Sequence, residues 1–303
     1  MTARPAIDLT QQAASGPEPS GRRIWSLVEV TLAFAVVHVT YRAFKHFTPL
    51  GRIEGAAHLN YSPGACMILF SVAAIWARGR SFDGYGLTLR NWRSNMNVGL
   101  VWGVLQVVLV GLIVKAAHVQ ADGGITPKLF PVCAAGALLL TALMLLMLRR
   151  DRHWLHIRAA ISLPLIFVLL SLPALVAMHH HRSVAHAIAA IGWSFFGAGF
   201  GEEIFFRGFV QSRVNQAFSR PLRLLGMQFG LGLIVSSLLF GFIHALNAVD
   251  YFQTRWTFAW TMGAAEVFAG IFLGAMHEKT GSVLPGAIAH GLGDVLPLVV
   301  VMR

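Results

Sequence analysis

Nine apolar segments divide this sequence, and each is long enough, or nearly long enough, to cross a lipid bilayer. A transmembrane helix needs about 20 apolar residues, because each residue rises about 1.5 Å and the hydrocarbon core is about 30 Å thick. The segments are Ile24–Phe44, Pro63–Ala77, Val98–His118, Phe130–Leu148, Ala159–Met178, Val184–Gln211, Leu225–Asn247, Phe258–Met276 and Val283–Met302. The sequence therefore predicts an all-α fold, a polytopic integral membrane bundle of about eight to nine transmembrane helices.

The composition supports a membrane location. Charged residues make up 12% of the chain and hydrophobic residues 56%, whereas a soluble domain carries roughly 25% charged residues. This balance argues against a soluble enzyme, a disordered chain and a secreted disulfide scaffold. The formal net charge of +11 would suggest nucleic-acid binding in a soluble protein. Here the basic residues lie between apolar segments, as in cytoplasmic loops, so we expect the bilayer as partner and no nucleic acid.

The chain divides into three parts. Residues 1–23 are polar and lack the apolar core of a signal peptide, which predicts a disordered cytoplasmic tail. With the amino terminus inside, the inner segments hold 15 Lys and Arg residues and the outer ones eight, which favours this orientation. Spans within 24–183 contain few ionisable residues away from their ends, and Glu29 and His38 are the inner exceptions. Spans within 184–303 contain more, so we expect any chemistry there.

Two adjacent carboxylates mark the sixth span. Glu203 and Arg207 are one helical turn apart and can form an ion pair, which leaves Glu202 without its own counter-ion. A carboxylate without a partner in a low-dielectric site is suited to act as a general base near neutral pH. The alternative is an interfacial helix end, at which Glu and Arg reach into water.

Three further spans carry ionisable groups. His244 follows Phe240 by one turn in the seventh span, and His290 precedes Asp294 by one turn in the last. A packed histidine and a structural His–Asp pair are the simpler alternatives. Glu266 is alone in the eighth span, and we expect a supporting role for it, in a pair with Arg207 or a histidine. A polar cavity shared by these groups would satisfy all of them, since a charge within a bilayer is costly without partners.

The order of these motifs resembles the CAAX-protease and bacteriocin-processing (CPBP) family of intramembrane proteases, also called the Abi or type II CAAX prenyl endopeptidase family. The family pattern is Glu-Glu-x-x-x-Arg, Phe-x-x-x-His and His-x-x-x-Asn/Asp, and it matches Glu202, Glu203, Arg207, Phe240, His244, His290 and Asp294. The resemblance implies an endopeptidase that cleaves a membrane-tethered protein or hydrophobic peptide. It makes 184–303 the catalytic core and 24–183 accessory, and it favours a bacterial inner membrane.

The resemblance also implies a role for each site residue. Glu202 would activate water with His244, and His290 would stabilise the oxyanion with help from the residue at Asp294. Glu203 would be structural with Arg207. Asn is common where this chain has Asp294, and an ionised Asp cannot donate to an oxyanion. Either Asp294 is protonated, or it orients His290 and the histidine alone donates.

The sequence leaves the metal question and the function class open. The spacing lacks the His-Glu-x-x-His helix of zinc proteases, which favours a mechanism that needs no cofactor. Glu202, His244 and His290 could alternatively hold Zn²⁺ with one open position. A non-catalytic immunity or scaffold protein and a proton-coupled transporter are the alternative functions. A transporter would be expected to show inverted repeats, and the sequence shows none.

One geometric conflict remains in the sequence. Glu202 lies about 16 Å from the Arg213 end of its helix, whereas His244 lies about 30 Å from Arg223, at about 1.5 Å per residue. The two side chains would then sit at different depths. We therefore predict that residues 216–230 run as an elbow along the membrane interface before the next span begins.

Overall fold

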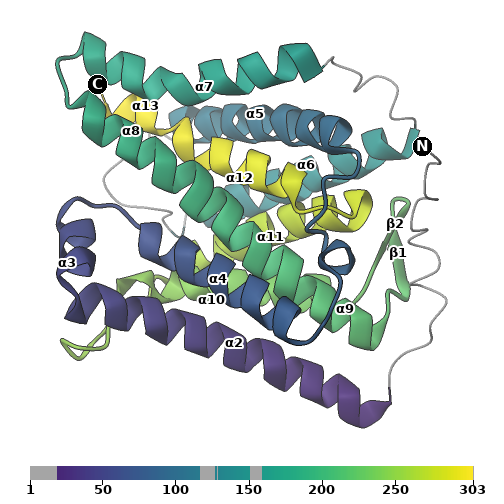
Figure 1. Ribbon diagram of the computed structural model, residues 1–303. Coiled ribbons are helices and arrows are strands. Elements are labelled where there is room, and N and C mark those ends of the chain that lie inside the picture. The colour runs from purple at the N-terminus through teal and green to yellow at the C-terminus, as the bar shows by residue number, and fades with distance from the viewer. Residues whose placement is uncertain (1–18, 117–126, 128, 151–158, 303) are drawn as a thin grey trace, which may run out of the picture.

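The computed structural model of the protein describes residues 19–116, 127, 129–150 and 159–302 (Figure 1). Residues 1–18 of the predicted tail and His118 lie outside these described residues. Each of the nine predicted segments contains a helix. The first is α2 (Ser20–Phe47), which begins four residues before the expected start at Ile24.

Long helices make up most of the structure. They are α2, α4 (Tyr61–Ala77), α5 (Trp92–Ala116), α6 (Phe130–Arg150), α7 (Ala159–His179), α10 (Leu231–Ala245), α11 (Trp260–Thr280) and α12 (Leu284–Val295). A continuous helical rod spans Val184–Phe218 and consists of α8 (Val184–Gly192), the π-helical stretches η3 (Trp193–Glu202) and η4 (Ile204–Gln211), and α9 (Ser212–Phe218). Short helices are α3 (Pro49–Ala56), η1 (Phe82–Tyr85), η5 (Leu246–Ala248) and α13 (Leu298–Val301).

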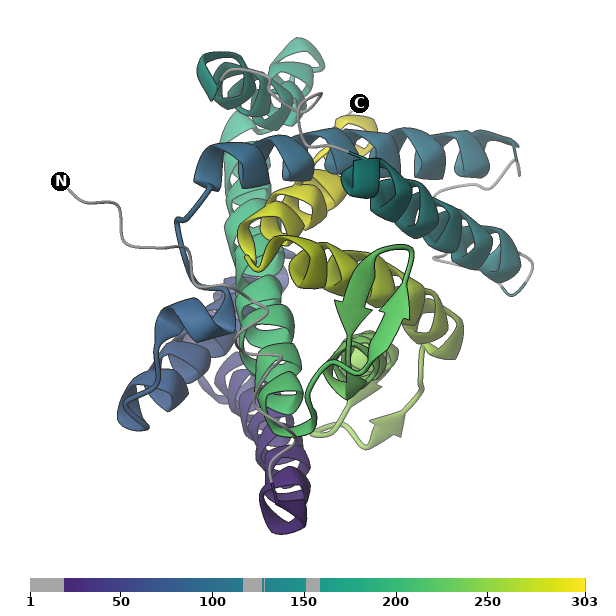
Figure 2. The same ribbon diagram turned by 90° about the vertical axis from the view of Figure 1, so that its right-hand side faces the viewer.

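Two short antiparallel hairpins complete the chain. β1 (Leu222–Leu224) pairs with β2 (Met227–Phe229), with Leu224 opposite Met227. The turn residues Leu225 and Gly226 both have positive φ, the geometry of the two-residue turns that suit hairpin twist. β3 (Val249–Asp250) pairs with β4 (Arg255–Trp256) in the connection between α10 and α11. Figure 2 views the end of the bundle that carries the β1–β2 hairpin.

This first hairpin corrects one predicted span and removes the depth conflict. The seventh apolar segment was expected to begin at Leu225, but α10 begins at Leu231. The residues between belong to the hairpin and its exit. His244 is consequently closer to the start of its helix than the sequence suggested. A contact between the rod and α10 places Phe206 and Ser236 at one level, because the Ser236 hydroxyl donates to the Phe206 carbonyl at 2.8 Å.

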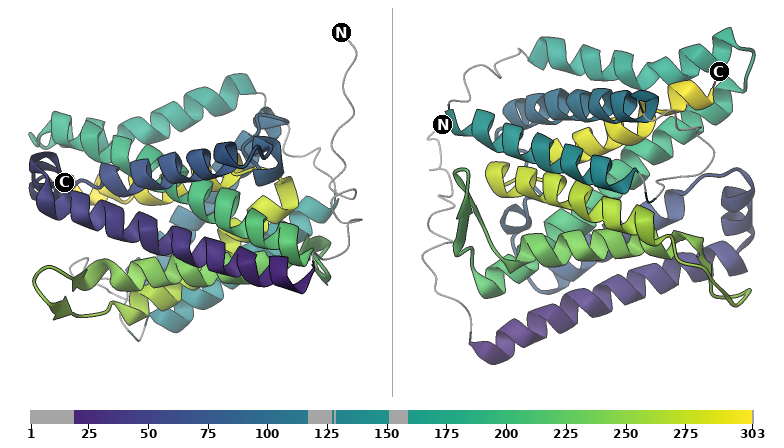
Figure 3. Two further views of the ribbon diagram at one scale, coloured as in Figure 1. Left: turned by 60° about the horizontal axis from the view of Figure 1, so that its bottom comes forward. Right: turned by 180° about the vertical axis from the view of Figure 1, so that it is seen from behind.

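The rod lies between α4 and α12, and α10 packs against both η4 and α11. In Figure 1, α2 and α7 form opposite edges of the bundle, and Figure 3 shows α10 beside α11 from behind. Small residues bring the helices close together. A Cβ atom on Gly201 would lie 2.6 Å from Cα of Gly64, so only glycine allows η3 and α4 this approach. A buried aromatic cluster, including Phe205, Phe206 and Phe240, fills the centre.

Large apolar side chains also cover the outside of the bundle. Leu69 is 70% exposed, and Trp76 and Phe167 are each 75% exposed. Such surfaces are unfavourable in water and contact acyl chains in a bilayer. Within the described residues, six helical segments are long and apolar enough to cross a membrane: Ser20–Phe47, Phe130–Arg149, Ala160–His179, Val184–Phe218, Leu231–Ala248 and Leu284–Val301. The predicted all-α polytopic membrane bundle is confirmed.

Candidate active site

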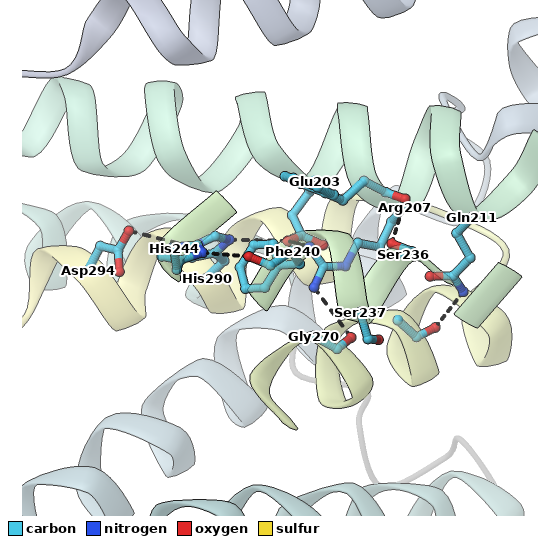
Figure 4. A network of polar contacts seen from close by, with 12 residues as sticks. Glu203, Arg207, Gln211, Ser236, Ser237, Phe240, His244, Gly270, His290 and Asp294 are labelled. Atoms are coloured by element: carbon cyan, nitrogen blue, oxygen red, sulfur yellow. Dashed lines mark hydrogen bonds and ion pairs between the residues drawn. The ribbon is translucent and has the colours of Figure 1, made fainter. Parts of the chain in front are cut away.

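Three helices bring the predicted site residues together in the middle of the bundle. Glu203 and Arg207 project from the rod, His244 from α10, and His290 and Asp294 from α12. Figure 4 shows these side chains as a row of polar contacts. Glu202 ends the π-helical stretch η3 and Arg207 lies within the π-helical stretch η4, with Glu203 between the two. Such turns are rare in proteins and occur frequently at functional sites.

The predicted ion pair between Glu203 and Arg207 is present. Arg207 Nη1 lies 2.9 Å from Glu203 Oε1, and both side chains are fully buried. The guanidinium also donates to the Gly270 carbonyl at 3.3 Å and lies 4.3 Å from the centroid of the Phe240 ring. Arg207 therefore connects the rod with both α10 and α11, and its charge is balanced inside the bundle.

Glu203 also binds His290, a contact that sequence reasoning missed. Its Oε1 atom lies 3.1 Å from His290 Nδ1, so one carboxylate oxygen faces both Arg207 and the histidine (Figure 4). Gly286 makes room for this approach, because a Cβ there would lie 2.8 Å from Glu203 Oε2. The only local signal in the sequence is that this glycine precedes His290 by one helical turn.

The two ring nitrogens of His290 face different carboxylates. Since the carboxylate of Glu203 can only accept when ionised, His290 Nδ1 carries the proton of that hydrogen bond. His290 Nε2 lies 3.6 Å from Asp294 Oδ2, too far for a hydrogen bond. The Asp294 side chain is 38% exposed. Glu203, rather than Asp294, is therefore the residue that fixes the His290 ring.

His244 is oriented by its own helix. Its Nδ1 atom lies 2.8 Å from the Phe240 carbonyl, and a carbonyl only accepts, so Nδ1 is the donor. In the neutral ring Nε2 is then the acceptor. The Phe240 ring packs against both histidines, with centroid distances of 4.7 Å to His244 and 5.7 Å to His290. Phe240 thus sets the positions of the two imidazoles relative to each other.

Glu202 differs from Glu203 in its surroundings. It is only partly buried, and within the described part of the chain it makes no hydrogen bond or ion pair. One of its carboxylate oxygens, Oε2, is buried without a partner. Glu202 directly precedes Glu203, whose carboxylate binds His290. The arrangement leaves Glu202 as the carboxylate able to bind a water molecule.

Glu266 lies near the site without joining the network. Among the described residues it forms no ion pair, although its charge acts on Arg207 and Asp294. The expected pairing of Glu266 with Arg207 or a histidine is therefore wrong. The reason is geometric, because Arg207 already has Glu203 and the Gly270 carbonyl as partners.

The residues do not fit a metal site. In the parts of the chain that the structure describes, no three His, Cys, Asp or Glu side chains are placed to hold one ion. Glu202, His244 and His290 consequently do not form the three-ligand set that zinc would need.

Comparison with known proteins agrees with this site. Residues 184–296 match the sequence model of a family described as type II CAAX prenyl endopeptidase Rce1-like. The match contains all six predicted site residues and begins at the first residue of α8. No curated protein and no solved structure matched the chain. This match supports the predicted resemblance to the CAAX-protease and bacteriocin-processing family, over residues 184–296 of the membrane bundle.

Proposed function

We propose that the protein is an intramembrane endopeptidase in which Glu202 activates the water that attacks a peptide bond. One observation carries this proposal: Glu202, which directly precedes the Glu203 that binds His290, holds a buried carboxylate oxygen without a hydrogen-bond partner. Peptide hydrolysis needs a base near the attacking water and charge stabilisation near the carbonyl oxygen. The family match supports a protease.

His244 would position the same water from α10. Because Nδ1 donates to the Phe240 carbonyl, the Nε2 lone pair can accept a hydrogen bond from water. Glu202 and His244 would then bind one water molecule from two sides, and Glu202 would take its proton as the oxygen attacks the carbonyl carbon. The same carboxyl group can return that proton to the departing amine.

His290 would stabilise the oxyanion in its doubly protonated form. Nδ1 donates to Glu203, so a neutral ring would present only a lone pair at Nε2 and could not donate to an oxyanion. An imidazolium donates from both nitrogens, and the carboxylates of Glu203 and Asp294 face these two atoms. Asp294 would therefore balance the charge of the ring, and Arg207 would balance Glu203.

We propose that this reaction needs no metal. The support is that the described residues offer no set of three His, Cys, Asp or Glu side chains placed to hold one ion. We expect the purified protein to keep its activity after treatment with a zinc chelator and removal of the chelator by gel filtration. Loss of activity that returns only with added Zn²⁺ would refute a metal-free mechanism.

The substrate would be a membrane-tethered protein or a hydrophobic peptide that reaches the site from the bilayer. The apolar outer surface and the position of the site among buried helices support this class. We also propose that the amino terminus faces the cytoplasm of a bacterial inner membrane. Basic residues from several elements gather at one end of the bundle, including Arg78, Arg80 and Arg213, as expected for a cytoplasmic face.

The test compares the terminal peptides of membrane proteins from cells that produce three forms of the protein. These are wild type, Glu202→Gln and the control Glu266→Gln, which removes a nearby intramembrane carboxylate outside the network. With wild type and Glu266→Gln we expect new membrane-protein termini that cells without the protein lack. With Glu202→Gln the amount of these termini should decrease by about 10²–10⁴-fold, the usual contribution of a general base.

Equal amounts of these termini from wild type and Glu202→Gln would remove Glu202 as the base. Identical termini in cells with and without the protein would instead favour a non-catalytic scaffold or immunity protein. The purified wild-type protein and a peptide that contains the identified cleavage site would then confirm that cleavage is direct.

A further inference from the structure

Helix α2 lies outside the family-matched segment, yet it binds the chain directly after His244. The Arg42 Nη2 atom donates to the Leu246 carbonyl at 2.7 Å. His38, one turn earlier on α2, forms a hydrogen bond with the Tyr251 hydroxyl at 2.8 Å. α2 therefore contacts both the end of α10 and the start of the connection to α11.

The contact of Arg42 with Leu246 supplies a hydrogen-bond donor for a carbonyl at the end of α10. α10 ends at Ala245, and Leu246 is its C-cap residue. The last carbonyls of a helix lack intrahelical partners, and in a low-dielectric bundle such groups need a donor. A cation at this end also interacts favourably with the helix dipole. Arg42 thus holds the last turn of the helix that carries His244, two residues before Leu246.

A second set of contacts fixes the connection itself. His38 has hydrogen bonds on both ring nitrogens, to Tyr251 and, at 2.9 Å, to the Tyr41 hydroxyl. The guanidinium of Arg42 lies 5.7 Å from the Tyr41 ring centroid and 6.0 Å from that of Tyr251. His38 and Tyr41 are buried, with exposures of 4% and 5%. The polar groups of His38, Tyr41 and Arg42 therefore either contact the α10–α11 connection or hold a group that contacts it.

The same face of α2 also lies close to the catalytic helices. Phe34 packs against Phe242 of α10, with ring centroids 6.0 Å apart, and stacks on His38. The contacts of α2 surround the end of α10 on which His244 lies.

From these contacts we infer that Arg42 and His38 are positioning residues for His244. They bind the end of α10 and the connection to α11, both of which follow His244 in the sequence. This inference rests on the proposed function of the protein. Without Arg42 the last turn of α10 loses the donor for its C-cap carbonyl and can fray, which displaces His244. A displacement of about 1 Å at a catalytic group can reduce a rate by about 100-fold.

The test uses four variants of the full-length protein in detergent micelles. Arg42→Gln removes the cation, Arg42→Lys keeps a cationic donor, and His38→Phe keeps the stacking on Phe34 but removes both hydrogen bonds. Arg52→Gln is the matched control, because Arg52 lies exposed on α3 at the same end of the bundle. Each is measured for kcat and KM on the cleaved peptide, for thermal unfolding, and for amide hydrogen exchange across residues 244–252.

We expect Arg42→Gln and His38→Phe to lower kcat by about 10–100-fold with KM within twofold, and to accelerate exchange across 244–252. Arg42→Lys should recover most of kcat, and Arg52→Gln should match wild type in every measurement. The inference is overturned if amide hydrogen exchange across 244–252 is unchanged in Arg42→Gln. It is also overturned if this exchange becomes faster while kcat stays at the wild-type value. A wild-type protein without any cleavage would refute the proposed function instead, and that outcome is read from wild type alone.

Discussion

The buried pair of Glu203 and Arg207 allows a quantitative prediction. Both side chains have 0% exposure, and besides the 2.9 Å ion pair the guanidinium contacts the Gly270 carbonyl and the Phe240 ring. Arg207→Met keeps much of the side-chain volume but leaves the Glu203 carboxylate with His290 as its remaining partner. Removing one partner of a buried ion pair typically costs about 3–5 kcal/mol, so we expect the free energy of unfolding to fall by that amount.

The assay is reversible unfolding of the purified protein in mixed micelles with an increasing fraction of SDS, followed by circular dichroism. Glu203→Gln/Arg207→Met should be less destabilised than the sum of the two single variants by about 1–3 kcal/mol, because the second change removes the orphaned charge. Arg52→Met, an exposed arginine to methionine change, is the control. A loss below about 1 kcal/mol in Arg207→Met, or strictly additive effects, would refute the reasoning.

Two further predictions concern Asp294 and Glu29. Asp294→Asn and Asp294→Leu should both lower kcat/KM, by up to about 10²–10³-fold, because the doubly protonated His290 loses the carboxylate that balances its charge and the site loses its oxyanion donor; full activity in Asp294→Asn would refute this role. Glu29→Gln should lower unfolding free energy in the SDS assay by about 3 kcal/mol, because buried Arg213 loses its charged partner, with activity per folded molecule unchanged. Wild-type stability in this variant would contradict the role of Glu29 as a bridge between α2 and α9.

The sequence was sufficient to predict the helices and the local pairs. Each apolar run of suitable length forms a helix, because backbone groups in a bilayer must be satisfied within the segment. The pair of Glu203 and Arg207 followed from their spacing on one helix. Three boundaries were wrong by six residues or more. α5 begins at Trp92 and not at Val98, and the rod ends at Phe218 and not at Gln211. α10 begins at Leu231 and not at Leu225, because apolarity alone does not separate a hairpin strand from the start of a span.

The contacts that complete the site could not be predicted in the same way. Glu203 binds His290 across 87 residues of sequence, and Arg42 binds Leu246 across 204. Such contacts depend on which helices become neighbours, and hydrophobic periodicity does not report that. His38 could be singled out only as an ionisable residue within an apolar span. One of its partners, Tyr251, lies in the connection between α10 and α11, 213 residues away in the sequence.

The adjacent glutamates acquire different roles from their partners rather than from their position in the sequence. Glu203 is fully buried and shares one oxygen with Arg207 and His290, so its charge is balanced and its position fixed. Glu202 is partly exposed and keeps a buried oxygen without a partner, which is what a base that binds water requires. Arg207 maintains this difference. Without it, Glu203 would keep His290 as a partner, but its buried charge would no longer be balanced.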